Sequence, residues 1–268
     1  MKKKYGLFSP FREIILHRRI LLSTTISEIQ KKYAGSLLGI LWAFLYPVLF
    51  LVVYATVYAV VFKVSYNELS TGEYIAIIFC GLIPFLGFSE SIQAGVGSVT
   101  ANAGLIKNTM FPIELVPVRT VFTAQMTHMS GTVILIIMII FIGRTSPTVL
   151  MCIPIWVLQV MFEIGLVWIL SSINVLVRDL QNIVSVVMIM LMMLSPIAYP
   201  MDSIPEMYGR FLKANPLFYF IVANQNVLMY GTNPPKEIWL PMILLGIGFF
   251  IVGYQFFIRM KRVFVDNV

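Results

Sequence analysis

Two acids in apolar surroundings are the residues whose chemistry most needs an explanation. Glu90 and Glu163 each lie within a long, otherwise uncharged run of the sequence. An ionised carboxylate is costly in such a place, so each must face a cavity, pair with another group or carry a proton. For Glu163 we favour interhelical hydrogen bonds to Gln93, Gln125 or Gln159. For Glu90 both alternatives remain open: a wall or gate of a cavity, or the same kind of hydrogen bonding.

These acids do not belong to a recognisable catalytic or metal-binding motif. The sequence contains no Gly-Lys dipeptide, and therefore no P-loop that could hold a phosphate. His17 and His128 lie far apart, and no His/Cys/Asp/Glu cluster has the spacing of metal ligands. Cys80 and Cys152 lie in apolar runs and are typical of small hydrophobes. We expect no catalytic residues, no cofactor and no metal in this chain.

A regular series of aromatic residues is the second candidate for binding chemistry. In the run "WAFLYPVLFLVVYATVYAVVF" every fourth residue is aromatic: Trp42, Tyr46, Phe50, Tyr54, Tyr58 and Phe62. A step of four advances a helix by about 400°, so the series drifts by about 40° per step, and Pro47 can add a kink. The series therefore cannot serve one function throughout. Trp42 and Tyr46 suit an anchoring belt at a membrane edge.

The composition places all of these residues in a membrane protein. Of the 268 residues, 59% are hydrophobic and 12% are charged, and the mean hydropathy is +0.90. A soluble domain cannot bury that much apolar surface. The first 32 residues contain no long apolar stretch followed by a small-residue cleavage site. We therefore expect no cleaved signal peptide, with the first span acting as the insertion signal.

Six apolar runs approach the length of about 20 residues that a membrane helix requires. We predict an all-α integral membrane protein whose membrane domain, 33–260, has spans near 35–62, 74–100, 119–142, 149–173, 183–200 and 238–258. The further uncharged run 214–235 is split by "NQN" at 224–226. We expect 201–236 to form a re-entrant outer hairpin that gates the exit, rather than a plain surface loop.

Charge placement supports this topology. With six spans and cytoplasmic termini, 14 of the 19 Lys and Arg residues fall on the inner side. A seventh span would place Arg259, Lys261 and Arg262 outside. Residues 1–32 combine apolar and basic positions and predict an amphipathic helix on the cytoplasmic surface, either as an anchor or also as a surface for a partner.

Small residues predict close helix packing at two places. Gly35 and Gly39 have the GxxxG spacing at the start of the first span, and Gly95 and Gly97 lie near the end of the second. Such residues let the backbones of neighbouring helices approach one another. We interpret both pairs as packing features rather than as functional sites.

Four segments, taken together, resemble a known family. They are "KKYAGSLLGILWAFLYP", "LIKNTMFPIELVPVRTV", the pair "VRDLQNIV" and "MLSPIAYPMDSIP", and "NPLFYFIVANQNVLMYG". In this order they resemble the membrane subunits of type-2 ABC exporters of polysaccharides, most of all the O-antigen permeases known as Wzm. One departure is that many relatives carry an Arg where Gln225 or a neighbour stands, so no fixed charge is carried over to the outer hairpin.

The resemblance implies a function and partners. It implies a homodimer of permease subunits in the bacterial inner membrane, paired with two cytosolic nucleotide-binding subunits that bind ATP and Mg²⁺. The substrate would be an undecaprenyl-pyrophosphate-linked polysaccharide, such as O-antigen, exported through a channel between the two permeases. A teichoic acid or capsule exporter is the nearest alternative. A secondary transporter would show inverted repeats and paired membrane acids, and neither is evident.

The resemblance also implies two sets of site residues. The loop 101–118 would dock on the ATPase through Asn102, Lys107, Met110, Phe111 and Glu114, with a second contact at Arg178 and Asp179; the alternatives are an ordinary loop and a solvated charge pair. A polysaccharide channel would be lined by aromatic side chains, which offer sugar rings weak and repeatable contacts. The channel candidates are Tyr54, Tyr58, Phe50, Trp42 and Glu90, with packing as the alternative for the aromatic residues.

Overall fold

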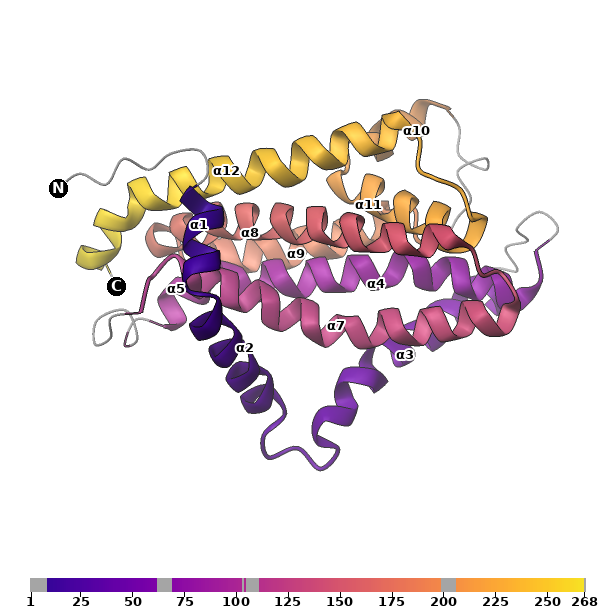
Figure 1. The fold of residues 1–268 in the computed structure, drawn as a ribbon, viewed down its shortest axis with the longest axis horizontal. Helices are drawn as coiled ribbons and strands as arrows, with labels where there is room; N and C mark the ends of the chain where they lie inside the picture. The colour runs from indigo at the N-terminus through magenta and orange to yellow at the C-terminus, as the bar shows by residue number, and fades with distance from the viewer. Residues whose placement is uncertain (1–8, 62–68, 103, 105–110, 199–205, 268) are drawn as a thin grey trace.

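The computed structural model describes residues 9–61, 69–102, 104, 111–198 and 206–267, and this part of the chain consists of helices and their connections (Figure 1). Five helical segments are long and apolar enough to cross a membrane: Gly39–Tyr58, Thr71–Val96, Leu115–Ile142, Pro147–Leu176 and Lys236–Lys261. They correspond to five of the six predicted spans. An all-α protein with several membrane-length helices is therefore confirmed.

The helices follow one another in a simple order. Two short helices, α1 (Ser9–Leu16) and α2 (Arg18–Tyr33), precede α3 (Trp42–Ala55), which extends from the 3₁₀ turn η1 (Gly39–Leu41) into the π-helical turn η2 (Thr56–Val61). Then come α4 (Thr71–Val96), α5 (Ser98–Ala101), α7 (Leu115–Ile142), the 3₁₀ turn η3 (Pro147–Met151) and α8 (Cys152–Leu176). The last are α9 (Leu180–Leu194), α10 (Glu206–Ala214), α11 (Pro216–Gln225), the π-helical turn η5 (Asn226–Tyr230) and α12 (Lys236–Asn267).

Helix α4 forms the centre of the bundle. Its apolar stretch is 78% buried, whereas that of the Gly39–Tyr58 segment is only 17% buried. It packs against α3, α7, α8, α9 and α11. Ser70 and Glu73 form a capping box that fixes where α4 begins, because each satisfies a backbone N–H of the other. Helix α3, in contrast, lies at the periphery, and only Ala43 and Pro47 of its residues are buried.

Helices α8 and α12 pack backbone to backbone. A Cβ atom on Gly165 would lie 2.2 Å from the carbonyl oxygen of Phe249, and one on Gly253 would lie 2.1 Å from the carbonyl oxygen of Gly165. Near the second predicted pair, a Cβ on Gly95 would lie 2.5 Å from Val167. A Cβ on Gly97 would lie 2.3 Å from Gln181. The predicted packing role of Gly95 and Gly97 is therefore confirmed.

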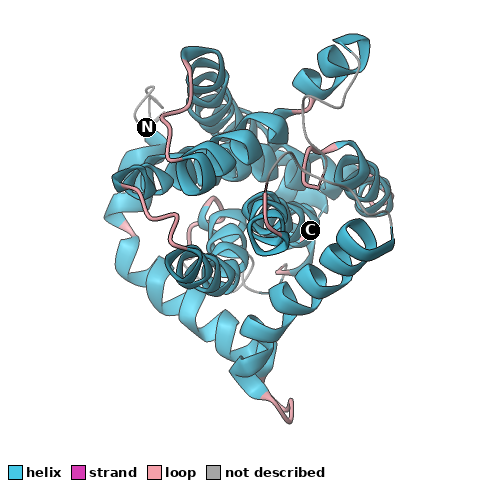
Figure 2. Cartoon of the chain, turned by 90° about the vertical axis from the view of Figure 1, so that its right-hand side faces the viewer, coloured by secondary structure: helices cyan, strands magenta, loops and turns pink. Residues whose placement is uncertain are grey.

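The packing role predicted for Gly35 and Gly39 is wrong. Both have positive φ angles, +78° and +51°, and neither has an atom within 4 Å of a Cβ position. They lie in the connection between α2 and α3, which projects away from the bundle in both Figure 1 and Figure 2. The first membrane-length helix begins only at Gly39. These glycines therefore allow a left-handed turn of the backbone instead of a close helix crossing.

The fifth predicted span is shorter than expected. Helix α9 has 15 residues and ends at Leu194, a length of about 22 Å at 1.5 Å per residue. The residues that follow, Ser195–Ala198, are buried but not helical. Side chains bond to this segment: Gln225 donates to the carbonyl of Pro196, Tyr74 to that of Ala198, and Asn215 to the hydroxyl of Ser195. The bonds to Pro196 and Ala198 compensate buried backbone that has no helical partners.

Within the segment predicted as an outer hairpin, the described residues from Glu206 to Tyr230 are helical except at Asn215. Residues 199–205 lie outside the described residues, and α10 and α11 follow them, joined at Asn215. Leu217, Phe220 and Ile221 of α11 are completely buried against the bundle. This arrangement fits a helical hairpin better than a plain surface loop, whereas its insertion into a membrane stays a prediction.

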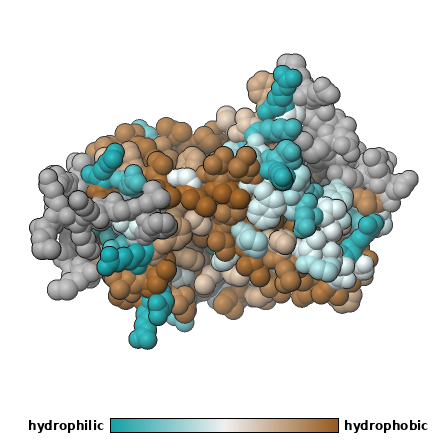
Figure 3. Space-filling model, turned by 45° about the horizontal axis from the view of Figure 1, so that its top comes forward, coloured by the Kyte–Doolittle hydropathy of each residue, from teal (hydrophilic) through white to brown (hydrophobic). Residues whose placement is uncertain are grey.

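The space-filling view shows apolar residues over much of the visible face and hydrophilic residues mainly toward the ends (Figure 3). Helix α5, the end of α12 and the α1–α2 corner lie at one end (Figure 1). The turn after α8 lies at the same end, because Asn174 bonds to Thr100 across 3.5 Å.

Candidate functional site

A cavity of about 430 Å³ lies between α2, α3, α4 and α7. Lys32 and Tyr33 of α2, Trp42 and Tyr46 of α3, and Glu90 and Gln93 of α4 line it. We call it the aromatic cavity, because rings form one of its sides. Its mixture of flat apolar faces and hydrogen-bonding groups is the kind of surface that binds molecules with both C–H and hydroxyl groups.

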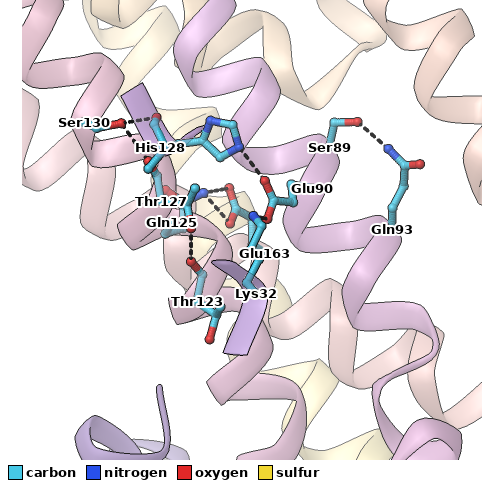
Figure 4. Close-up of polar contacts among 11 residues, drawn as sticks. Lys32, Ser89, Glu90, Gln93, Thr123, Gln125, Thr127, His128, Ser130 and Glu163 are labelled. Atoms are coloured by element: carbon cyan, nitrogen blue, oxygen red, sulfur yellow. Dashed lines mark hydrogen bonds and ion pairs between the residues drawn. The ribbon is translucent and has the colours of Figure 1, made fainter. Parts of the chain in front are cut away.

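Glu90 joins three helices at the wall of this cavity (Figure 4). Its Oε1 lies 2.5 Å from Nζ of Lys32 on α2, and its Oε2 lies 2.8 Å from Nε2 of His128 on α7. The His128 side chain is only 3% exposed. Both alternatives left open by the sequence therefore apply at once, since the carboxylate is paired and also lines a cavity. Its role in translocation stays a prediction.

Glu163 is completely buried in a hydrogen-bond cluster. Gln125 of α7 donates through Nε2 to both carboxylate oxygens, at 2.8 and 2.7 Å, and Gln159 donates through Nε2 at 2.9 Å. Trp156 donates to Oε1 of Gln125 at 2.9 Å, which fixes the orientation of that amide. The predicted interhelical bond of Glu163 is confirmed for Gln125, whereas Gln159 lies on the same helix as Glu163 and Gln93 bonds to Ser89 instead.

The aromatic series divides into separate pairs on α3 and η2. The rings of Tyr46 and Phe50 lie 4.9 Å apart, and those of Tyr54 and Tyr58 are stacked at 5.7 Å with an angle of 19° between their planes. The π-helical turn begins at Thr56, between the two stacked residues. Its i→i+5 bonding widens the turn, so residues four apart drift less there than in an α-helix. Of the described residues of this series, Trp42 and Tyr46 line the aromatic cavity.

Of the residues predicted to contact an ATPase, those that the structure describes lie at one end of the bundle. Lys107 and Met110 lie outside the described residues. Phe111 is partly buried, Arg178 and Asp179 are exposed in the turn before α9, and Asn102 accepts a hydrogen bond from Arg119 at 2.9 Å. Their contact with an ATPase stays a prediction.

Glu114, the fifth loop candidate, is bound within the chain. Its carboxylate lies 2.8 Å from Nζ of Lys261 on α12, and its backbone carbonyl accepts a hydrogen bond from Trp168 on α8. The side chain therefore ties the start of α7 to α12, which positions the end of the loop.

Some polar residues of the site could not be recognised from the sequence. Arg119 is 5% exposed and lies 3.5 Å from Glu28, so it connects α2 to Asn102 and to the loop region. Lys32 and His128 pair with Glu90, although neither was a candidate. The partners are 17 to 91 residues apart, so no local spacing could have paired them.

The comparison with known families decides what kind of protein carries this site. The ABC-2 type transporter family matches residues 21–229, a range that includes the aromatic cavity and the Glu163 cluster. The chain belongs to this family. The resemblance to type-2 ABC exporters is thereby confirmed, and the family is one of transporter membrane subunits, which agrees with the expected transport role.

Several curated relatives of this ABC-2 transporter protein match most of its length. An O-antigen export system permease protein RfbA from Klebsiella pneumoniae is 29% identical, covering 92% of this chain and 94% of its own length. The RfbA permease of Myxococcus xanthus is 26% identical over 96% of this chain and 98% of its own length. The polysialic acid transport protein KpsM of Escherichia coli is 23% identical over 77% of this chain and 80% of its own length.

Proposed function

We propose that this ABC-2 transporter protein is the permease subunit of an ATP-driven exporter of lipid-linked O-antigen in the bacterial inner membrane. It acts as a homodimer with two nucleotide-binding subunits, and the polysaccharide passes through a channel to which Tyr54, Tyr58 and Phe50 contribute. The aromatic cavity with Trp42 and Glu90 lies on the same path. The energy comes from ATP hydrolysis in the partner subunits.

The observation that carries this proposal is the match to O-antigen permeases over almost the whole chain. Their similarity covers 92% to 96% of this chain, whereas that of the polysialic acid transporter covers 77% at lower identity. The aromatic lining of the cavity supports the same substrate class, because aromatic faces bind sugar rings without holding them tightly. A capsular or teichoic acid exporter is the alternative.

The proposal includes six spans, with α9 and the buried segment Ser195–Ala198 as the fifth. Helix α9 alone covers about 22 Å of the hydrocarbon core, which is about 30 Å thick. The non-helical segment continues the path inside the bundle, where protein rather than lipid surrounds it. Six spans place both termini and the 101–118 loop in the cytoplasm, and α10 and α11 at the outer side.

Deletion of the gene for this chain in its own host tests the function. We expect loss of O-antigen from the cell surface and accumulation of the undecaprenyl-linked glycan inside the cell, with recovery when the gene is restored. Surface glycan can be resolved by gel electrophoresis, and the lipid-linked glycan can be extracted and sized. Loss of capsule with normal O-antigen would favour the alternative exporter, and an unchanged glycan surface would contradict both.

Replacement of Phe111 by aspartate is expected to release the ATPase subunit. Phe111 lies at the proposed cytoplasmic end, and a charge in the apolar centre of an interface costs far more than one on its rim. We expect co-purification of the ATPase with the tagged permease to fall at least about tenfold, which corresponds to about 1.4 kcal/mol.

The matched control is Phe211→Asp, which makes the same change on the exposed face of α10, at the opposite end of the bundle. It should leave co-purification unchanged. Equal recovery of the ATPase with the Phe111 variant would exclude this residue from the coupling contact.

A further inference from the structure

A second cavity, separate from the aromatic cavity, opens on the side of the bundle. It has a volume of about 360 Å³ and lies between α4, α7, η3 and α8, with Asn224 of α11 at its edge. Ile83, Met129 and Ile153 contribute to its apolar walls, and Met129 and Ile153 are 46% and 62% exposed. We call it the lateral groove. Its apolar walls and few polar groups are those of a small-molecule site.

The polar residues of the lateral groove have hydrogen-bonding capacity left over. Gln159 uses only its Nε2, which donates to the carbonyl of Pro84 and to Glu163. Asn224 uses its Nδ2, which donates to the carbonyl of Phe220, and His128 uses its Nε2, which contacts Glu90. Within the described part of the chain, Oε1 of Gln159, Oδ1 of Asn224 and Nδ1 of His128 have no hydrogen-bond partner.

The two amide oxygens are hydrogen-bond acceptors, and Nδ1 of His128 is one in the tautomer that carries its proton on Nε2. Gln159 uses both of its N–H groups, on Pro84 and Glu163, and Asn224 uses one of its two, on Phe220, so both amide oxygens remain as acceptors. When Nε2 of His128 donates its proton to the carboxylate of Glu90, the neutral ring keeps Nδ1 as an acceptor. Gln159 and His128 are 2% and 3% exposed, so bulk water reaches them poorly. A ligand that donates hydrogen bonds would complete this set.

The neighbouring charges define the ligand further. The carboxyl group of Glu163 bonds to both Gln125 and Gln159, two residues of the groove, and Glu90 lies behind His128. Lys32, the cation that pairs with Glu90, lines the other cavity. Acceptors backed by carboxyl groups repel an anion and attract a hydroxyl or amine group.

We propose that the lateral groove binds an apolar chain that ends in a hydrogen-bond donor, such as a long-chain alcohol or amine, and rejects a carboxylate of the same length. The chain lies against Met129 and Ile153, and its donor reaches Gln159, Asn224 and His128. Because His128 lines this groove and also bonds to Glu90 of the aromatic cavity, occupancy on one side affects the carboxylate on the other.

Fluorescence quenching in lipid nanodiscs tests the proposal. Trp156 lines the groove and is one of the four tryptophans in the chain. Titration with 11-bromoundecanol should quench it along a saturating curve, and the Trp156→Phe variant should lack that component. Brominated undecanoate should bind at least about fivefold more weakly, as expected for the loss of one hydrogen bond.

Two substitutions place the binding in the groove. Ile153→Phe fills the groove and should weaken binding of the alcohol about tenfold, whereas Val157→Phe, on an exposed position of the same helix outside the groove, should not. Asn224→Ala should weaken binding of the alcohol about fivefold, because the alcohol donates its hydrogen bond to Oδ1 of this residue.

Two results would overturn the proposal. Equal, non-saturating quenching by the alcohol and the carboxylate would mean that ordinary bilayer lipid surrounds Trp156. No quenching of Trp156 by either compound would mean that another part of the assembly, such as a second copy of the chain, covers the groove. Neither measurement uses transport, so either result leaves the proposed export function untouched.

Discussion

Replacement of Gly253 by alanine is expected to lower the stability of the fold strongly. The new Cβ atom would lie 2.1 Å from the carbonyl oxygen of Gly165 and 2.8 Å from its Cα. Both atoms belong to the backbone of α8, so no side chain can move aside, and the two helices must separate along their contact. Overpacking in a core costs about 1–3 kcal/mol even where side chains can yield, and the cost here lies at or above the upper value.

The expected loss is visible as a fall in thermal stability. A cost of about 3 kcal/mol corresponds to a drop of roughly 10 °C in Tm for a chain of this size. The Tm can be measured as the temperature at which the purified protein loses its size-exclusion peak. Gly165→Ala should lower the Tm by a similar amount, because its Cβ would lie 2.2 Å from the carbonyl oxygen of Phe249.

Gly248→Ala is the matched control for both glycine variants. It makes the same change in the same helix, at a position with no atom within 4 Å. It should change stability little, and alanine even favours a helix over glycine. If Gly253→Ala and Gly248→Ala melted at the same temperature, the close contact between α8 and α12 would be refuted.

The sequence predicted membrane-length helices well because their signal is local and large. Uncharged runs of about 20 residues have few alternatives to a membrane helix, and five of them became the long helices of the bundle. The fifth span was predicted to end too late because the apolar sequence continues past the residue at which the helix ends. Pro196 disfavours helical backbone at Ser195, and α9 ends one residue earlier, at Leu194.

The glycines show why contacts are harder to predict than helices. A GxxxG pattern indicates only that a helix surface could allow the close approach of another helix. Gly35 and Gly39 do not lie at a helix interface. Gly165 and Gly253 form the tightest contact between α8 and α12, yet they are 88 residues apart and lie in different apolar runs. Their pairing depends on how two helices cross, which no single segment determines.

The same reasoning explains the partial success at the polar site. Burial alone demanded partners for Glu163, and the few amides in neighbouring apolar runs restricted the choice, so Gln125 was predictable. Glu90 instead pairs with Lys32, which belongs to the segment predicted to lie on the membrane surface. Only the path of α2 along α7 brings that lysine to the carboxylate.

Replacement of both Tyr54 and Tyr58 by alanine is expected to block glycan export while the permease still assembles. Their rings are stacked at 5.7 Å and are only partly buried, so part of each remains available to a passing sugar. Each aromatic contact contributes about 1 kcal/mol, so the loss of two lowers export about thirtyfold. Surface O-antigen can be measured on gels, and assembly by the size of the purified complex.

Two further variants separate the contributions of the rings from those of the hydroxyls and of the helix surface. Phenylalanine at both positions keeps the aromatic faces and removes the hydroxyls, so it should retain most of the export if stacking dominates. Alanine at Val52 and Val53, which are 55% and 61% exposed on the same helix, should have little effect. Normal surface glycan in the Tyr54→Ala/Tyr58→Ala variant would exclude this pair from the channel wall and leave it a packing role. A channel that moves a polysaccharide past aromatic faces must export less when two of those faces are removed.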